Sequence, residues 1–244
     1  MSGEIVLPDT SLCAIVRDEK MNPAGGIERF VHAHIPHVEE AVIVDTGSID
    51  GTREILEQLE SKYHNLRVLD HPFKSYAEAR NFSLDNARAK YALILDADEL
   101  LTCERPTNEW EKLLSFYHRR LNLKGNLLRL INGNLFNRCL FDFQHISPNS
   151  NSVVSGGHYQ RFFVNSSSNR YSCGSFANEF LVGEGFLKEG EPSKTKIRHF
   201  IASESARSLK RMDWYYMENP AIAPSSIDGF SKWKKYNPKR DNYF

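Results

Sequence analysis

The sequence lacks any long apolar stretch. Its 244 residues have a mean hydropathy of -0.49, and no apolar run is longer than the one from Tyr91 to Leu95. A helix that crosses a bilayer needs about 20 consecutive, mostly apolar residues. The first residues, Met1 to Glu4, carry no basic charge and lead into no apolar segment of signal-peptide length. We therefore expect no transmembrane segment, no secretory signal and a cytoplasmic location.

An excess of either charge is also missing. Lys and Arg together number 31, as do Asp and Glu, so the formal net charge is zero. A protein that neutralises nucleic-acid phosphates normally has a clear basic excess, so we expect no nucleic-acid partner. Hydrophobic residues make up 41% of the chain and charged residues 25%. This composition is typical of a globular protein that can bury a core.

Paired cysteines and glycine-rich phosphate loops are absent as well. The cysteines are scattered, with no C-x-x-C pair: Cys13, Cys103, Cys139 and Cys173. This spacing excludes a disulfide framework and the usual zinc sites. No G-x-G-x-x-G and no G-x-x-x-x-G-K-[ST] motif occurs, which disfavours a dinucleotide-dependent dehydrogenase and a P-loop NTPase.

What the sequence does have is a regular alternation in its first hundred residues. Short apolar runs, typical of strands buried on both faces, alternate with segments of helical periodicity. The expected strands are Leu12–Val16, Ala41–Val44, Leu66–Leu69 and Tyr91–Leu95, and the expected helices are 25–34, 55–62 and 76–87. This order predicts an α/β fold with a doubly wound, mainly parallel sheet that is flanked by helices.

The second half of the chain is less regular. We expect helices over 110–121 and 203–217, strands over 126–131, 159–164 and 197–200, and a long loop over the Asn-, Ser- and Gly-rich residues 134–157. Residues 219–244 form an irregular tail of mixed basic and aromatic side chains. We expect this tail to pack on the domain, with a peripheral membrane contact or a flap over the binding site as alternatives.

Acidic residues gather where the expected strands end. They are Asp18 and Glu19 after the first strand, Asp45 after the second, and Asp96 and Asp98 after the fourth. Ligands of parallel sheets bind beyond the carboxyl ends of the strands. Of two carboxylates at such an end, one can face a ribose and the other a divalent cation, because Mg²⁺ and Mn²⁺ prefer oxygen ligands. Capping of a following helix is the alternative role for these residues.

Three ordered segments resemble the family 2 glycosyltransferases of the GT-A fold. They are Val42–Thr52 (VIVDTGSIDGT), Ala77–Asn81 (AEARN) and Asp96–Glu99 (DADE). The resemblance implies a single GT-A-like domain over 1–218, with a nucleotide-sugar half over 10–102 and an acceptor half over 103–218. The activity it implies is inverting, metal-dependent sugar transfer of the hexosyltransferase kind. The donor would be a nucleotide sugar, usually linked to UDP, and the acceptor a glycan, a lipid-linked sugar or another hydroxyl.

The same resemblance implies roles for residues around the nucleotide. Asp45 would accept a hydrogen bond from the nucleobase. Val16 and Arg17 would border the nucleotide, and Glu19 would lie near the ribose or the base. Arg80, in the AEARN segment, would contact the base or the diphosphate. For Asp50 and Thr52 the alternative is a structural role, since both residues can cap the helix that follows.

The metal ligands implied by the resemblance are Asp98 and His199. Asp96 would lie near the ribose, and Asp98 would hold Mn²⁺ or Mg²⁺ at the diphosphate. His199, in the sequence IRHF, resembles the late histidine that several GT-A enzymes supply to the metal, although a lone histidine at a strand end is often structural. Three clustered histidines are expected to be surface or packing residues: His32, His34 and His37.

A candidate catalytic base comes from a looser match. Residues 161–179, from RFFV to ANE, resemble the family's R-x-F-R … G-x-V-H-E stretch, which makes Glu179 the candidate. Asn178 stands where many relatives have His, and a solvated loop glutamate is the alternative. Two other carboxylates are weaker candidates: Glu99 and Asp142.

Two other classes of protein remain open. A nucleotidyltransferase also binds a metal and a nucleotide at strand ends, but it usually has a Gly-rich phosphate loop, which the turn over residues 17–21 lacks. A non-catalytic binding module on the same scaffold would tolerate loss of the acidic cluster, yet Asp96, Asp98 and Glu99 are all present.

Overall fold

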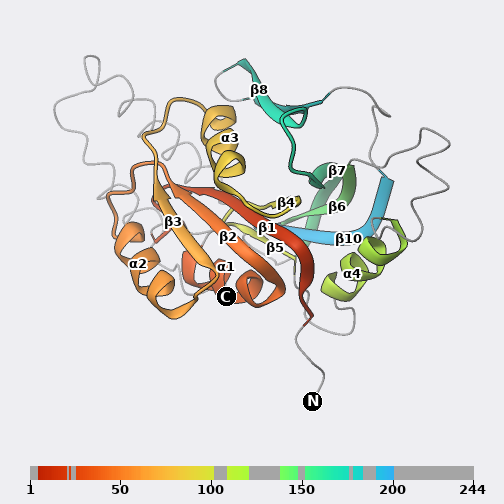
Figure 1. Cartoon of the computed structure of the whole chain (residues 1–244), viewed down its shortest axis with the longest axis horizontal. Helices are drawn as coiled ribbons and strands as arrows, with labels where there is room; N and C mark the ends of the chain where they lie inside the picture. Colours follow the sequence, from red (N-terminus) through yellow and green to blue (C-terminus); the bar gives the residue numbers. More distant parts are fainter. Residues whose placement is uncertain are drawn as a thin grey trace.

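The computed structural model describes residues 5–20, 22, 26–101, 109–120, 138–147, 152–175, 178–183 and 191–200. These residues form an eight-stranded sheet with helices on both faces and a separate two-stranded hairpin (Figure 1). The expected α/β fold with a mainly parallel sheet is confirmed. Among the described helices, none has the length and apolar character to span a membrane.

The first half of the chain follows the expected alternation. Its elements are β1 (Leu7–Val16), α1 (Ile27–His34), the 3-10 turn η1 (Ile35–His37), β2 (Val38–Asp45), α2 (Thr52–Lys62), β3 (Leu66–Asp70), α3 (Tyr76–Asn86) and β4 (Tyr91–Ile94). The four strands are parallel and lie in the order β3-β2-β1-β4. Strand β1 begins earlier than expected, and its register shifts between Leu7 and Ser11, where Asp9 has a positive φ of 49°.

The second half adds antiparallel strands to this sheet. Its elements are β5 (Glu99–Leu100), α4 (Glu109–Arg120), β6 (Arg138–Ile146), β7 (Val153–Val164), β8 (Arg170–Ser175), β9 (Asn178–Val182) and β10 (Glu191–Phe200). The helix expected over 110–121 and the strands expected over 159–164 and 197–200 are confirmed within α4, β7 and β10. The strand over 126–131, the helix over 203–217 and the tail lie outside the described residues.

The long loop expected over residues 134–157 is wrong where the structure describes it. Strands β6 and β7 form an antiparallel ribbon that includes Arg138–Ile146 and the first residues of β7. The side chains from Val153 to Gly156 are exposed, which explains the error: a ribbon open to water tolerates Ser and Gly at positions that a buried strand would fill with apolar residues.

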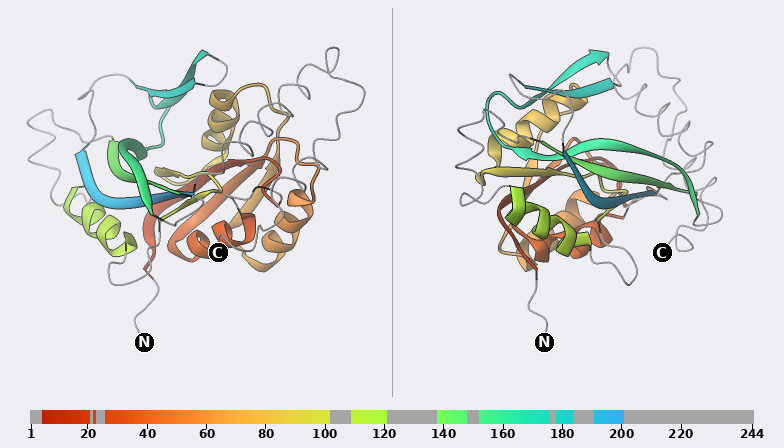
Figure 2. Two further views of the ribbon diagram at one scale, coloured as in Figure 1. Left: turned by 180° about the vertical axis from the view of Figure 1, so that it is seen from behind. Right: turned by 90° about the vertical axis from the view of Figure 1, so that its right-hand side faces the viewer.

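Alternate side chains along the central strands pack on opposite faces of the sheet. Leu12, Ala14 and Val16 of β1 join the core beneath α1, α2 and α4. Cys13, between them, faces α3 together with Ala92 of β4. Figures 1 and 2 show α3 and the β8–β9 hairpin on one side of the sheet and the other three helices on the opposite side. Successive side chains of a strand point to opposite faces of the sheet, so a strand between two helical layers has apolar residues on both faces.

One edge of the sheet collects the carboxyl ends of its long strands. Strands β4 and β6 are both antiparallel to β7 and therefore run in the same direction, and β10 is parallel to β6. The ends of β1, β2, β4, β6 and β10 consequently meet at the same edge. The acidic residues identified in the sequence lie there, so this edge is the place to look for a ligand site.

Candidate functional site

The segment Asp96–Glu99 is a closed turn that is tied to the last strand. The backbone N–H of Glu99 donates to the carbonyl of Asp96 over 2.9 Å, and the backbone N–H of Asp96 donates to Glu99 Oε2 over 3.0 Å. Glu99 pairs with His199 across the β5–β10 ladder, and the N–H of Phe200 donates to the carbonyl of Asp98 over 2.9 Å. The carboxylates of this turn are therefore held on a fixed backbone.

Two arginines from different elements enter this acidic turn. Arg80 of α3 places Nη2 2.7 Å from Asp96 Oδ1, and Arg161 of β7 places Nη2 2.6 Å from Glu99 Oε1 and 3.6 Å from Asp96 Oδ2. Burial alone would raise the pKa of Asp96, but the two guanidinium groups hold it well below its usual range. Burial raises the pKa of Glu99 to about 8, because it outweighs the opposing effect of Arg161.

Glu179 joins the same group of charges from the β8–β9 hairpin. Its Oε1 accepts a hydrogen bond from Arg80 Nε over 2.5 Å, while its Oε2 is buried and has no hydrogen-bond partner in the described part of the chain. The five side chains form a row in which acidic and basic residues alternate: Glu179, Arg80, Asp96, Arg161 and Glu99. We call these residues the charged row. Glu179, taken from the looser sequence match, thus shares Arg80 with Asp96.

The AEARN segment explains how the hairpin is anchored. The side-chain amide of Asn81 donates to the carbonyl of Tyr171 over 2.9 Å and accepts from its N–H over 2.8 Å. The guanidinium of Arg80 lies 5.7 Å from the centre of the Tyr171 ring. Helix α3 itself begins with a capping hydrogen bond, in which the N–H of Glu78 donates to Ser75 Oγ over 3.2 Å. Consecutive residues of α3 therefore fix both the hairpin and its carboxylate.

Asp98 and His199 form a second pair beside the charged row. His199 Nε2 lies 3.4 Å from Asp98 Oδ2, and the other ring nitrogen, Nδ1, lies 2.9 Å from Nδ1 of His145 on β6. Although burial lowers the pKa of His199, the hydrogen bond and charge of Asp98 raise it to about 9. One oxygen atom from each of Asp96, Asp98 and Glu99 lies within 4.8 Å of the others.

This donor set fits a divalent cation. Arginines form ion pairs with Asp96 and Glu99, and His199 lies within ion-pair distance of Asp98. A carboxylate oxygen and an imidazole nitrogen at this separation are ligands that Mn²⁺ accepts. The structure therefore brings together the two residues expected as metal ligands, Asp98 and His199, and it balances their neighbours with arginine.

Asp45 is the last residue of β2, and its two carboxylate oxygens differ in their hydrogen bonding. Its Oδ1 accepts from the backbone N–H groups of Gly47 (2.8 Å) and Ser48 (2.7 Å), and Gly47 takes the positive φ of 108° that this tight turn requires. Its Oδ2 is buried and has no hydrogen-bond partner among the residues that the structure covers. Asp50, by contrast, accepts from the N–H of Thr52, the first residue of α2, over 2.8 Å, while Gly51 is the N-cap residue of that helix.

The residues expected to border the nucleotide lie at the end of β1 and in the turn that follows it. Val16 packs in the core, and its carbonyl accepts from Thr46 over 3.0 Å. The carboxylate of Glu19 is buried and accepts from Asn22 over 2.8 Å. Arg17 Nε lies 4.0 Å from the carboxylate of Asp18. The nucleotide roles of these residues stay predictions.

Two residues near the acidic turn were given no role in the sequence analysis, Arg161 and His145, and His34 was expected only as a surface or packing residue. His34 is fully buried and accepts a hydrogen bond from the N–H of Leu101 over 3.2 Å. Its place four residues after Phe30 on the apolar face of α1 was the available signal. The sequence signal for Arg161 was weaker: it is a charged residue directly followed by two phenylalanines. Asp142 lies within β6, and no contact with the acidic turn is seen for it in the described residues.

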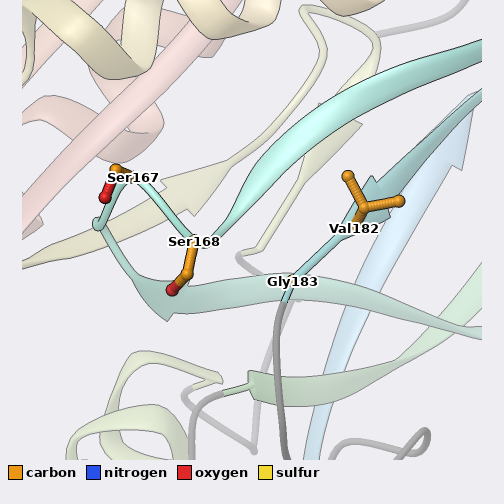
Figure 3. Close-up of a pocket in the computed structure, with 4 residues that line it drawn as sticks. All are labelled: Ser167, Ser168, Val182 and Gly183. Atoms are coloured by element: carbon orange, nitrogen blue, oxygen red, sulfur yellow. The ribbon is translucent and has the colours of Figure 1, made fainter.

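A pocket of about 490 Å³ lies elsewhere, at the end of the β8–β9 hairpin (Figure 3). The described residues that line it are Ser167, Ser168, Val182 and Gly183. None of these four has an ionisable side chain. The described lining of this pocket therefore includes no residue of the acidic turn.

Comparison with known proteins agrees with the sequence resemblance. The family "Glycosyl transferase family 2" matches residues 24–122. A TPR repeat-containing protein of Synechococcus elongatus is 33% identical over 109 residues, which are 45% of this chain and 24% of that protein. The putative teichuronic acid biosynthesis glycosyltransferase TuaG of Bacillus subtilis is 36% identical over 99 residues, 38% of this chain and 37% of TuaG.

The matched region covers less than two thirds of the length of either relative. Among solved structures, S. aureus TarS 1-349 in complex with UDP aligns with a TM-score of 0.41 and 16% identity, over 60% of this chain and 38% of that one.

Proposed function

We propose that the protein is an inverting, metal-dependent glycosyltransferase, a proposal supported by the match of residues 24–122 to the family "Glycosyl transferase family 2". It moves a sugar from a nucleotide sugar, with a UDP-sugar as the first expectation, to a hydroxyl group of a glycan or of a lipid-linked acceptor. The observation that carries the proposal is the pairing of Asp98 with His199 beside the charged row, at the edge where the strands end.

The nucleotide is held at the end of β2 in this proposal. Asp45 has a buried oxygen, Oδ2, with no hydrogen-bond partner in the described part of the chain. A nucleobase N–H can donate to this atom, which removes the cost of leaving a buried acceptor unsatisfied. Because Oδ1 is fixed by Gly47 and Ser48, the free oxygen has a set direction.

Asp98 and His199 would hold Mn²⁺ or Mg²⁺ next to the donor diphosphate. When bound, such an ion acts as a Lewis acid that stabilises the charge left on the diphosphate. The chain contributes the geometry: β5 and β10 fix the backbone of Asp98, and His145 fixes the ring of His199. Arg161 and Arg80 neutralise Asp96 and Glu99, which limits the repulsion between the carboxylates and the phosphates.

Glu179 is the proposed catalytic base. Inversion in one step forms a bond from the acceptor oxygen to the anomeric carbon while the bond from that carbon to the donor phosphate oxygen breaks. The acceptor hydroxyl loses its proton in this step, and a carboxylate can take it. Oε1 of Glu179 accepts from Arg80, whereas Oε2 has no hydrogen-bond partner among the described residues, so Oε2 is the oxygen that would take the proton.

A thermal-shift screen of the full chain tests the proposal. UDP, GDP and their sugar derivatives are compared with and without Mn²⁺, for the wild type and for Asp98→Asn. A ligand at a hundred times its Kd stabilises a protein by about 2.7 kcal/mol, which is about 5 °C or more for a chain of this size. We expect this shift for the correct nucleotide with Mn²⁺ in the wild type and a much smaller one in Asp98→Asn.

Asp142→Asn is the matched control, because it also removes a carboxylate but lies outside the acidic turn. It should behave like the wild type. The proposal is wrong if no nucleoside diphosphate or nucleotide sugar stabilises the wild-type chain in the presence of Mn²⁺.

A further inference from the structure

His34 is a polar side chain in an apolar environment. It lies in the last turn of α1 with no exposed surface, and its ring contacts Phe30 at 4.7 Å and Trp110 at 5.9 Å between centroids. A buried imidazole without hydrogen bonds is costly, so both of its nitrogens need partners. The structure supplies one partner from its own helix and one from a distant segment.

These two partners define the state of the ring. His34 Nδ1 lies 2.7 Å from the carbonyl oxygen of Phe30, and since a carbonyl can only accept, Nδ1 carries the hydrogen. The N–H of Leu101 donates to Nε2 over 3.2 Å, so Nε2 is the acceptor. His34 is therefore neutral, in one tautomer, and connects α1 to a backbone position 67 residues away.

The distant partner belongs to the acidic turn. Leu101 directly follows β5, which consists of only Glu99 and Leu100, and Asp98 directly precedes it. Strand β10 holds this segment through its ladder with β5. His34 also holds this segment, through a hydrogen bond to the backbone of a residue that is itself fully buried. If His34 could not accept, the N–H of Leu101 would lack this partner and the segment could move to find another.

We infer that His34 is a positioning residue, which fixes the backbone that follows Asp98 and so sets where this carboxylate meets a divalent cation. The inference rests on the proposed function, because it assumes that Asp98 binds the cation. His34 itself touches neither the cation nor the donor. Its contribution is the hydrogen bond to Leu101, and side chains that keep or lose this bond can be compared.

Three substitutions of His34 separate the hydrogen bond from packing. Gln places an acceptor oxygen where Nε2 lies and can keep the bond to Leu101. Asn keeps a donor at the place of Nδ1 but is too short to reach Leu101. Phe keeps a ring of similar size and loses both bonds. His32→Phe is the matched control, because His32 is an exposed residue of the same helix that contacts Tyr63.

The test measures the Kd of Mn²⁺ alone by isothermal titration, together with the unfolding temperature of each full-length variant. We expect Kd to rise about tenfold in His34→Phe and His34→Asn, as for other residues that orient a metal ligand without touching the metal. His34→Gln should stay within about twofold of the wild type, as should His32→Phe. If His34→Phe does not fold, His34→Asn against His34→Gln decides the question.

The outcomes separate the two proposals. Wild-type Kd values for folded His34→Phe and His34→Asn would overturn the positioning role and leave the proposed function intact. A Kd that rises equally in the Gln and Asn variants would also overturn the positioning role. The loss of Mn²⁺ affinity would then result from changed packing rather than from loss of the hydrogen bond to Leu101. A wild-type chain that binds no Mn²⁺ would overturn the cation site and this inference with it.

Discussion

Arg80 and Glu179 are 99 residues apart in the chain, and the guanidinium of one donates directly to the carboxylate of the other. Arg80 also contacts Asp96 with a different nitrogen. One buried side chain of α3 therefore connects the carboxylate expected near the donor ribose with the proposed base. The hairpin that carries Glu179 has its place over the site because of this contact and the neighbouring one between Asn81 and Tyr171.

Loss of Arg80 should be strongly destabilising. In Arg80→Met, the carboxylates of Asp96 and Glu179 lose a common partner that is itself buried, and breaking such a pair costs about 3 kcal/mol. Urea unfolding followed by circular dichroism measures the change. Arg53→Met is the matched control, since its exposed pair with Asp70 should contribute less than about 1 kcal/mol. Equal losses in both variants would contradict the structural importance of Arg80.

Glu179→Gln should separate donor binding from sugar transfer. Gln keeps an oxygen that can accept from Arg80 Nε, so the hairpin should stay in place. It cannot take a proton from the acceptor hydroxyl, and removal of a general base lowers rates by about 10²–10⁴-fold. Release of the nucleoside diphosphate measures kcat, and titration with the donor measures Kd. A kcat within about twofold of the wild type would exclude Glu179 as the base.

His145→Phe should weaken cation binding without touching either proposed ligand. His145 contacts the ring nitrogen of His199 that faces away from Asp98. Such second contacts orient a metal-binding imidazole, and their loss costs about 10–100-fold in metal affinity. Titration with Mn²⁺ gives the comparison, with His158→Phe on the adjacent strand as the control. Unchanged affinity in His145→Phe would mean that the ring of His199 needs no support from β6.

Acid should destabilise the protein in part through His34. Burial lowers the pKa of His34 to about 3, against an ordinary value of 6.5. Because the folded pKa is the lower one, the unfolded chain binds the extra proton as pH falls below 6.5. The stabilisation is then complete above pH 6.5 and is lost progressively towards pH 3. One such group contributes a slope of at most about 1.4 kcal/mol per pH unit.

Urea unfolding between pH 7 and pH 4 checks this slope. We compare the wild type with His34→Gln, which has no titrating group at this position. The wild type should lose stability more steeply over this interval, and the two curves should approach each other as pH falls. Parallel curves would show that protonation of His34 makes no contribution to acid unfolding.

The sequence was sufficient to predict the parallel half of the sheet and the acids at its edge. Uninterrupted apolar runs such as Ala41–Val44 have few alternatives to a buried strand, and the residue that follows such a run must lie at the edge. The exposed ribbon of β6 and β7 could not be predicted in this way. The polar first half of this ribbon has neither an apolar run nor a clear alternation of apolar and polar residues. Its strand pairing therefore depends on tertiary contacts, which the local sequence does not indicate.

The partners within the site were harder to predict than its acids. Asp98 and His199 came from the resemblance, but Arg161 contacts Glu99 only because β7 lies next to β4. His34 meets Leu101 only because α1 packs beneath β5. Such contacts depend on strand order and helix placement, which local sequence patterns do not contain.

The pairing of β5 with β10 has a consequence for synthesis of the protein. The first hundred residues contain their own parallel strands and helices, so much of that sheet can form while the chain is still being made. The acidic turn, however, receives the contact with Arg161 and its antiparallel neighbour β10 only from segments that are made later. Contacts between residues so distant in sequence form slowly. We therefore expect nascent chains shorter than about 200 residues to fold in part yet bind no Mn²⁺, so that the ability to bind arises only late in translation.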